Sequence, residues 1–289
     1  MRILLSALLL ALLAGGAVAA AELRPLTGEP TAGATEAVHL GDSYAAGTGV
    51  TPLAADSPFP CQRSARNFGA LLARREHWRL TDVSCAGATT AELGRPQYEG
   101  VPAQLEALGP QTAVVTLTIG GNDAGLFSRL VGGCTRAGRS DPRGHPCRDE
   151  LSGELTAALD GQVAPDLRRA LARIRAAAPN AQILVAGYPR ILPATGGCFD
   201  QVSIAAGDRP FVRRMEERLN QAVQTAAMAA GATFVDMTGP SAGHDVCAGA
   251  AQRWVEPMID GPGALHPNAR GQQAIADAVA AARGAAGPR

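Results

Sequence analysis

Short apolar runs alternate with amphipathic stretches along most of this 289-residue chain. The clearest run, at 113–119, is continuous and rich in β-branched residues, which is typical of a strand covered on both faces. Shorter runs at 37–40, 183–186 and 233–237 have the length and composition of strands, and apolar and polar residues alternate like a strand at 78–83. The pattern therefore predicts five strands.

Between these runs, apolar residues recur with the spacing of one helix face. This spacing predicts helices over 67–76, 164–178, 211–230 and 268–283, with a short helix over 102–108. Polar, glycine-rich or irregular sequence predicts loops over 132–147, 191–208 and 239–263.

Strand and helix alternate about five times, which argues for a parallel sheet with helices on both faces. No internal repeat or linker interrupts the alternation, so we expect one domain over 37–284. The predicted fold is α/β, a three-layer α/β/α sandwich around a mainly parallel sheet. Residues 22–36 predict a flexible leader, and 285–289 a short tail.

The first 21 residues predict a cleaved signal peptide. Arg2 precedes an apolar run at 3–13, and small residues follow, with cleavage sites readable after Ala19 or Ala21. An uncleaved membrane anchor is the alternative, because the uncharged run is nearly long enough to span a bilayer. The small residues favour cleavage, so we expect a secreted protein.

The composition, with a formal net charge of +0, argues against a nucleic-acid partner, which would need a basic face. In an exported chain the six cysteines predict three disulfides, for which fifteen pairings are possible. The chain lacks Cys-x-x-Cys and His-x-x-x-His spacings, so we expect no metal. Nothing in the sequence demands an oligomer or a cofactor, and we expect a monomer.

A candidate nucleophile lies directly after the first strand, in the stretch Gly41-Asp42-Ser43-Tyr44. This is not the Gly-x-Ser-x-Gly elbow of the α/β-hydrolases, because Ala45 stands at the second glycine position. Three further pieces follow in order: Gly87 after the second strand, Asn122 after the third, and His266 before the last helix. Loops at the carboxyl ends of parallel strands lie at one edge of the sheet, so these pieces can meet.

The chemistry needs these residue types. A serine that attacks an ester needs a base near neutral pH, and His266 is of the right kind. The developing oxyanion needs donors, which the backbone N–H groups of Ser43 and Gly87 and the amide of Asn122 could supply. We expect an acyl-enzyme on Ser43 that water, activated by His266, hydrolyses.

The order and context of these blocks resemble the SGNH (GDSL) family of esterases and lipases. The blocks read GDSY at 41–44, CAGAT at 85–89, GGND at 120–123 and LHPN at 265–268. The resemblance covers nearly the whole mature chain. It is similar to secreted actinobacterial members with three sequential disulfides, which implies the pairs Cys61–Cys85, Cys134–Cys147 and Cys198–Cys247.

One position departs from the family pattern, which places Asp three residues before the histidine. Gly263 stands there, followed by Ala264. Some relatives use a Ser-His dyad in which a backbone carbonyl orients the imidazole, and Gly263 is the first choice here, with Ala264 second. Asp260 and Glu256 are alternatives, since a loop could bend either carboxylate inward.

Other residues have simpler interpretations. We expect His39 to be a satisfied core side chain, His77 and His145 to lie on the surface, and Asp123 to hold its loop. The pair His244-Asp245 is a rival candidate for the base.

The sequence thus predicts a secreted serine esterase or lipase whose substrate is a small-molecule or lipid ester and whose contact with a lipid interface would be transient. A carbohydrate acetylesterase, a phospholipase A, an acyltransferase or a non-catalytic surface-binding module are the alternatives. A binding module would not need Ser43, Asn122 and His266 together.

Overall fold

The computed structural model describes residues 33–258 and 261–285. The predicted signal peptide, most of the predicted leader and the last four residues of the tail lie outside the described residues, as does Asp260.

Five parallel strands form one sheet in the order β2-β1-β3-β4-β5. The strands are β1 (Glu36–Gly41), β2 (Arg79–Asp82), β3 (Val114–Thr118), β4 (Gln182–Ala186) and β5 (Thr233–Val235). Every strand expected from the sequence is present, and the parallel order confirms the α/β class.

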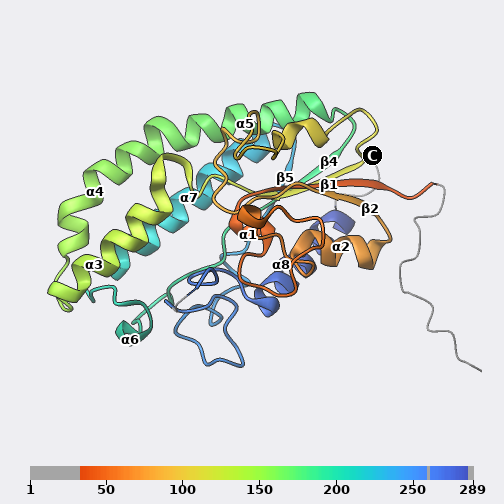
Figure 1. The fold of residues 1–289 in the computed structure, drawn as a ribbon. Coiled ribbons are helices and arrows are strands. Elements are labelled where there is room, and N and C mark those ends of the chain that lie inside the picture. The colour runs from red at the N-terminus through yellow and green to blue at the C-terminus, as the bar shows by residue number, and fades with distance from the viewer. Residues whose placement is uncertain (1–32, 259–260, 286–289) are drawn as a thin grey trace, which may run out of the picture.

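Helices cover both faces of the sheet (Figure 1), because successive side chains of each strand point to opposite faces. Val115 and Leu117 pack into a core cluster with residues of α4 (Pro146–Ala158), α5 (Ala164–Ala177) and α7 (Arg209–Ala229). Val114 and Leu184 pack into a second cluster with residues of α2 (Phe68–Glu76) and α8 (Ala269–Ala285). The three-layer sandwich follows from strands that are apolar on both sides.

The main helices are α2 (Phe68–Glu76), α3 (Gly133–Ser140), α4 (Pro146–Ala158), α5 (Ala164–Ala177), α7 (Arg209–Ala229) and α8 (Ala269–Ala285). Two four-residue helices, α1 (Ser43–Ala46) and α6 (Phe199–Val202), lie in loops. The expected short helix near 102–108 is a 3-10 helix, Gln104–Ala107. Within the described ranges no helix is long and apolar enough to cross a membrane.

The expectation of a loop over 132–147 is wrong for its first half, which forms helix α3. Glycines lower the helix propensity here, but tertiary packing overrides it. Gly138 lies so close to Ser203 that an added Cβ would come within 2.2 Å of the Ser203 carbonyl oxygen. A glycine that looks like a helix breaker in the sequence is here required by the packing.

Three disulfides tie down the loops, with the pairing implied by the family resemblance: Cys61–Cys85, Cys134–Cys147 and Cys198–Cys247. No free cysteine occurs among the described residues. The first of these bridges joins the loop before α2 to the loop that carries Gly87.

Candidate active site

The turn that carries Ser43 is built on a glycine that no other residue could replace without strain. Gly41 ends β1 with φ at +123°, and a Cβ there would lie 2.3 Å from the carbonyl oxygen of Thr118. The Gln104 side chain holds both polar groups of Gly41, accepting its N–H at 2.7 Å and donating to its carbonyl at 3.0 Å. Asp42 then caps α1 by accepting the N–H of Tyr44 at 2.9 Å. The backbone is therefore fixed on both sides of Ser43.

Ser43 and His266, which are 223 residues apart in the sequence, are hydrogen-bonded in the structure. The distance between Ser43 Oγ and His266 Nε2 is 2.8 Å. The other ring nitrogen, Nδ1, lies 2.7 Å from the carbonyl oxygen of Ala264. A carbonyl can only accept, so Nδ1 carries the proton, and Nε2 is left to accept from the serine hydroxyl. This is the tautomer that a general base requires.

His266 is placed by contacts on both sides of its backbone. The Tyr44 hydroxyl donates to the carbonyl of Leu265 at 2.6 Å, which ties the residue after the serine to the residue before the histidine. Leu265 has φ at +58°, an uncommon conformation for a branched residue. Asn268 caps α8 by accepting the N–H groups of Arg270 and Gly271. The histidine is therefore held between a strained residue and a helix start.

The carbonyl that orients His266 belongs to Ala264, so the preference for Gly263 was wrong. The Gly263 carbonyl accepts the backbone N–H of His266 at 3.1 Å, closing a tight turn, and it is the next carbonyl that meets the ring. Glu256 is not an alternative, because Arg253 and Asn268 donate to its two carboxylate oxygens.

The three expected oxyanion donors lie on loops after β1, β2 and β3. Ser43 and Asn122 are partly exposed, and Gly87 is exposed with φ at +78°. Within the described ranges, neither the Ser43 N–H nor the Gly87 N–H donates to a protein acceptor. One proton of the Asn122 amide goes to the carbonyl of Ala88 at 3.1 Å, which holds Asn122 against the Gly87 loop and leaves its second proton for a ligand.

Burial of the ring lowers the pKa of His266, against an opposing effect of the Ala264 carbonyl, which favours the protonated form. A lowered pKa keeps the imidazole neutral at neutral pH. The residue is therefore available as a base without prior deprotonation.

Two buried carboxyl groups flank these loops. Burial raises the pKa of Asp42 to about 7 and that of Asp123 to about 6. Asp123 accepts from the backbone N–H and the hydroxyl of Thr90, at 2.8 and 2.6 Å, so it holds its loop, as expected.

The remaining histidines do not join this arrangement. His39 is fully buried between Thr116 and the Ala45 carbonyl, which agrees with a satisfied core side chain. His244, the rival base, bonds the Gln252 carbonyl and stacks on Trp254, while Asp245 accepts from Cys247. In the described part of the chain, no group of three or more His, Cys, Asp or Glu side chains could hold a metal ion.

A cavity of about 470 Å³ borders His266, a volume typical of small-molecule sites. Thr48, Arg66 and Asn268 contribute to its wall. A much smaller apolar cavity of about 30 Å³ lies beside Tyr44 and Phe127, which has room for little more than one methylene group.

Two site residues, Gln104 and Tyr188, have no signature in the sequence. Tyr188 follows β4, and its buried hydroxyl contacts both Asp42 and Gly121. Neither residue lies in one of the four blocks, and both act through side chains that reach a distant loop.

A serine-histidine pair at the carboxyl edge of a parallel sheet, beside backbone and amide donors, agrees with the match of residues 39–274 to the GDSL-like lipase/acylhydrolase family. The chain belongs to this family and is a carboxylic ester hydrolase.

Its similarity to individual relatives is extensive. It is 42% identical to Lipase 2 of Streptomyces coelicolor over 264 residues, which cover 90% of this chain and 88% of the relative. Two crystal structures superimpose with TM-scores of 0.74: an extracellular lipase from Streptomyces rimosus (29% identity) and phospholipase A1 from Streptomyces albidoflavus (26% identity). Each match covers 86% of this chain, together with 100% of the lipase and 99% of the phospholipase.

Proposed function

We propose that this chain hydrolyses acyl-lipid esters through an acyl-enzyme on Ser43, with His266 as general base. The observation that carries the proposal is the hydrogen bond of 2.8 Å between Ser43 Oγ and His266 Nε2, with Nδ1 of the same ring bound to a carbonyl. In the first step the Ser43 oxygen bonds to the ester carbonyl carbon while its proton passes to Nε2. The tetrahedral intermediate then collapses, and Nε2 returns the proton to the departing alcohol.

The negative oxygen of the intermediate accepts hydrogen bonds from the N–H groups of Ser43 and Gly87 and from the Asn122 amide. One such donor typically contributes about 3–4 kcal/mol to lowering the barrier. In the second step His266 takes a proton from water and the hydroxide attacks the acyl carbon. The new intermediate then breaks its bond to the Ser43 oxygen, which receives the proton back from His266, and the acid is released. The Ala264 carbonyl fixes the tautomer in both steps but carries no full charge to stabilise the imidazolium.

A lipid-like substrate is supported by the relatives, which are named lipase and phospholipase A1. The cavity of about 470 Å³ beside His266 would take the alcohol part, because the histidine delivers its proton to the alcohol oxygen. The apolar cavity of about 30 Å³ is too small for a long acyl chain, so such a chain would lie along the surface or part the side chains there.

Secretion, a single catalytic domain over 37–284 and a monomeric state belong to the same proposal. The three disulfides are typical of oxidising compartments, and one structural relative is named an extracellular lipase. Contact with a lipid surface is supported by Phe59, a residue that is 82% exposed on the loop whose Cys61 is bonded to Cys85.

The test is the rate of hydrolysis of nitrophenyl esters of increasing chain length, with wild type and Ser43→Ala measured side by side. The proposal predicts Ser43-dependent turnover with a maximum at medium or long chains. Turnover confined to the acetyl ester would identify a carbohydrate-type acetylesterase. Equal rates for the two proteins would remove Ser43 from the chemistry.

A further inference from the structure

The hydroxyl of Tyr188 lies between the two loops that carry Ser43 and Asn122. Tyr188 follows β4 and is buried, and its oxygen is 2.5 Å from Asp42 Oδ2 and 2.7 Å from the backbone nitrogen of Gly121. Asp42 is the residue before the serine, and Gly121 is the residue before Asn122. One oxygen atom therefore bonds both loops.

The direction of these hydrogen bonds is determined by their donors. The Gly121 N–H can only donate, so the Tyr188 oxygen accepts it, and the hydroxyl proton points to Asp42. The other oxygen of Asp42 accepts the N–H of Tyr44. A continuous chain of hydrogen bonds thus runs from the Asn122 loop through Tyr188 to the first turn after the serine.

Only a glycine allows the close approach at one end of this chain. A Cβ on residue 121 would lie 2.9 Å from the Tyr188 hydroxyl oxygen, closer than side chains tolerate. The second glycine of the GGND block is therefore explained by the tyrosine, which lies 67 residues further along the chain.

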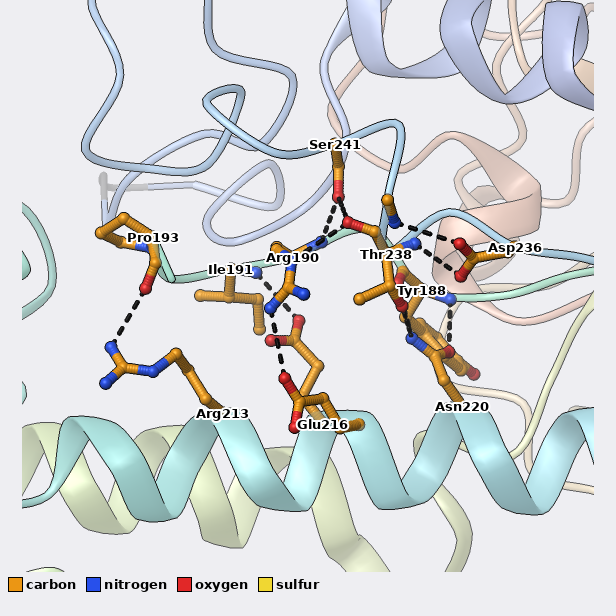
Figure 2. A network of polar contacts seen from close by, with 12 residues as sticks. Tyr188, Arg190, Ile191, Pro193, Arg213, Glu216, Asn220, Asp236, Thr238 and Ser241 are labelled. Carbon is orange, nitrogen blue, oxygen red and sulfur yellow. Dashed lines mark hydrogen bonds and ion pairs between the residues drawn. The ribbon is translucent and has the colours of Figure 1, made fainter. Parts of the chain in front are cut away.

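Tyr188 is itself held by helix α7. Asn220 accepts the Tyr188 N–H at 2.8 Å and donates to the Tyr188 carbonyl at 2.9 Å, and it also reaches the Thr238 hydroxyl at 3.1 Å (Figure 2). The same face of α7 holds the rest of this loop, with Glu216 accepting from Ile191 and Arg213 donating to the Pro193 carbonyl (Figure 2). The 21-residue helix α7 thus fixes the backbone of Tyr188, and the tyrosine ring extends from there to the site.

We propose that Tyr188 is a positioning residue for ester hydrolysis, whose hydroxyl sets the Ser43 turn and the Asn122 loop at the separation that the oxyanion hole needs. The inference rests on the proposed function. The donors of such a hole come here from separate loops, and a misplacement of about 1 Å can reduce a rate about 100-fold. The hydroxyl of Tyr188 acts through Asp42 and Gly121, which it bonds. The Tyr188 ring also packs against the ring of Tyr44 at 5.0 Å, a contact that Tyr188→Phe keeps.

Removal of the hydroxyl should also alter the pH profile. The Tyr188 hydrogen bond stabilises the charged form of Asp42, against burial and the nearby charge of Asp123. Tyr44 faces Asp42 from α1 with its N–H, and Glu216 on α7 acts on the Tyr44 side chain. Without the Tyr188 hydroxyl the pKa of Asp42 rises further, so Asp42 would be protonated over a wider pH range.

The test compares Tyr188→Phe with wild type on a soluble nitrophenyl ester. We expect kcat to fall about 10- to 100-fold with KM within about twofold, and the acid limb of the kcat profile to move to higher pH. Asn220→Ala removes the two hydrogen bonds that hold the Tyr188 backbone, and it should lower kcat in the same way. In the double variant, the fold decrease in kcat should be smaller than the product of the two single decreases.

Two controls separate positioning from loss of fold. Arg213→Gln removes a bond from the same face of α7 to Pro193, with no contact to the site, and should keep the wild-type kcat. A serine-reactive fluorophosphonate counts the competent sites, so kcat is expressed per labelled serine.

The inference is overturned if Tyr188→Phe keeps the wild-type kcat and pH profile, or if its whole loss disappears on correction for labelled sites. A change in KM alone would also overturn it, since that would make Tyr188 a substrate contact. Ser43→Ala is run in the same assay, and if it matches wild type the proposed function fails instead.

Discussion

The carbonyl oxygen of Ala264 lies 2.7 Å from Nδ1 of His266, in the place where the usual family pattern supplies an aspartate. His266 has the same tautomer as in a triad, with the proton on Nδ1, because a carbonyl accepts the hydrogen bond from Nδ1 as a carboxylate would. It lacks the negative charge that would stabilise the imidazolium formed during the reaction. We therefore expect the imidazole to be oriented as in a triad but the imidazolium to be stabilised less.

If the Ala264 carbonyl is the orienting group, neither Asp260 nor Glu256 is needed for the chemistry. We expect Asp260→Asn and Glu256→Gln each to keep kcat/KM within about threefold of wild type, whereas loss of the acid from a true triad typically lowers kcat about 10,000-fold. Steady-state kinetics on a soluble ester decides the matter. A fall of several orders of magnitude in either variant would identify a carboxylate that acts on His266.

The Asn122 side chain should act mainly in the transition state. Asn122→Ala is expected to lower kcat about 100- to 1,000-fold with little change in KM, because the oxyanion forms only after attack. Asn180→Ala is the matched control. Asn180 is exposed just before β4, at the opposite edge of the sheet from the site, and its amide donates to the Pro110 carbonyl. Equal turnover of Asn122→Ala and wild type would exclude the oxyanion role.

Glu216 should make the folded protein less stable in alkaline solution. Burial raises its pKa to about 8, above the ordinary value of 4.5 for an unfolded chain. The folded state then holds the proton more tightly, so this stabilisation is complete below pH 4.5 and is lost as the pH rises through about 8. Between pH 6 and 9 the loss is about 2–3 kcal/mol of unfolding free energy.

Denaturant unfolding at these two pH values tests the assignment to Glu216. Glu216→Gln keeps an acceptor for the Ile191 N–H but cannot ionise, so its stability should fall less between pH 6 and 9. Glu99→Gln, at an exposed position outside α7 whose charge is not among those that act on Glu216, should retain the wild-type pH dependence. Identical pH dependence in Glu216→Gln and wild type would show that Glu216 is not the titrating group.

Phe59 is expected to affect the hydrolysis of aggregated substrates only. Phe59 is exposed on a loop that the Cys61–Cys85 disulfide joins to the loop that carries Gly87. Phe59→Ser is expected to lower hydrolysis of an emulsified long-chain ester several-fold, by weakening adsorption, and to leave a dissolved short-chain ester unaffected. Met228→Ser provides the control, because Met228 is 68% exposed at the end of α7 that leads into β5, away from the site. Parallel losses on both substrates would argue against an interfacial role.

Much of this architecture could be predicted from local pattern. Strand β3 is buried along its whole length, and Val114 and Val115 show why its residues are apolar: adjacent side chains pack into different layers. The residues Ser43, Gly87, Asn122 and His266 were predictable because each stands beside the end of a strand or the start of a helix. The parallel topology then brings the loops to one edge.

The remainder depends on contacts that local sequence does not encode. Helix α3 forms although its glycines have a low helix propensity. One of them, Gly138, packs so closely on the backbone of Ser203 that a side chain would not fit there. The choice between the Gly263 and Ala264 carbonyls follows from a turn in which the first is already used by the His266 N–H. Tyr188 and Gln104 act across 146 and 63 residues of sequence, respectively, and only the folded chain reveals their partners.

The central claim is that Ser43 is the nucleophile and that His266 activates it. The most direct measurement is reaction with a fluorophosphonate, followed by peptide mass mapping and residual activity on the same samples. We predict one label per chain, located on Ser43, with activity lost in proportion to labelling and no labelling of His266→Ala. A label on another residue, or full activity in protein whose Ser43 is fully labelled, would contradict the mechanism.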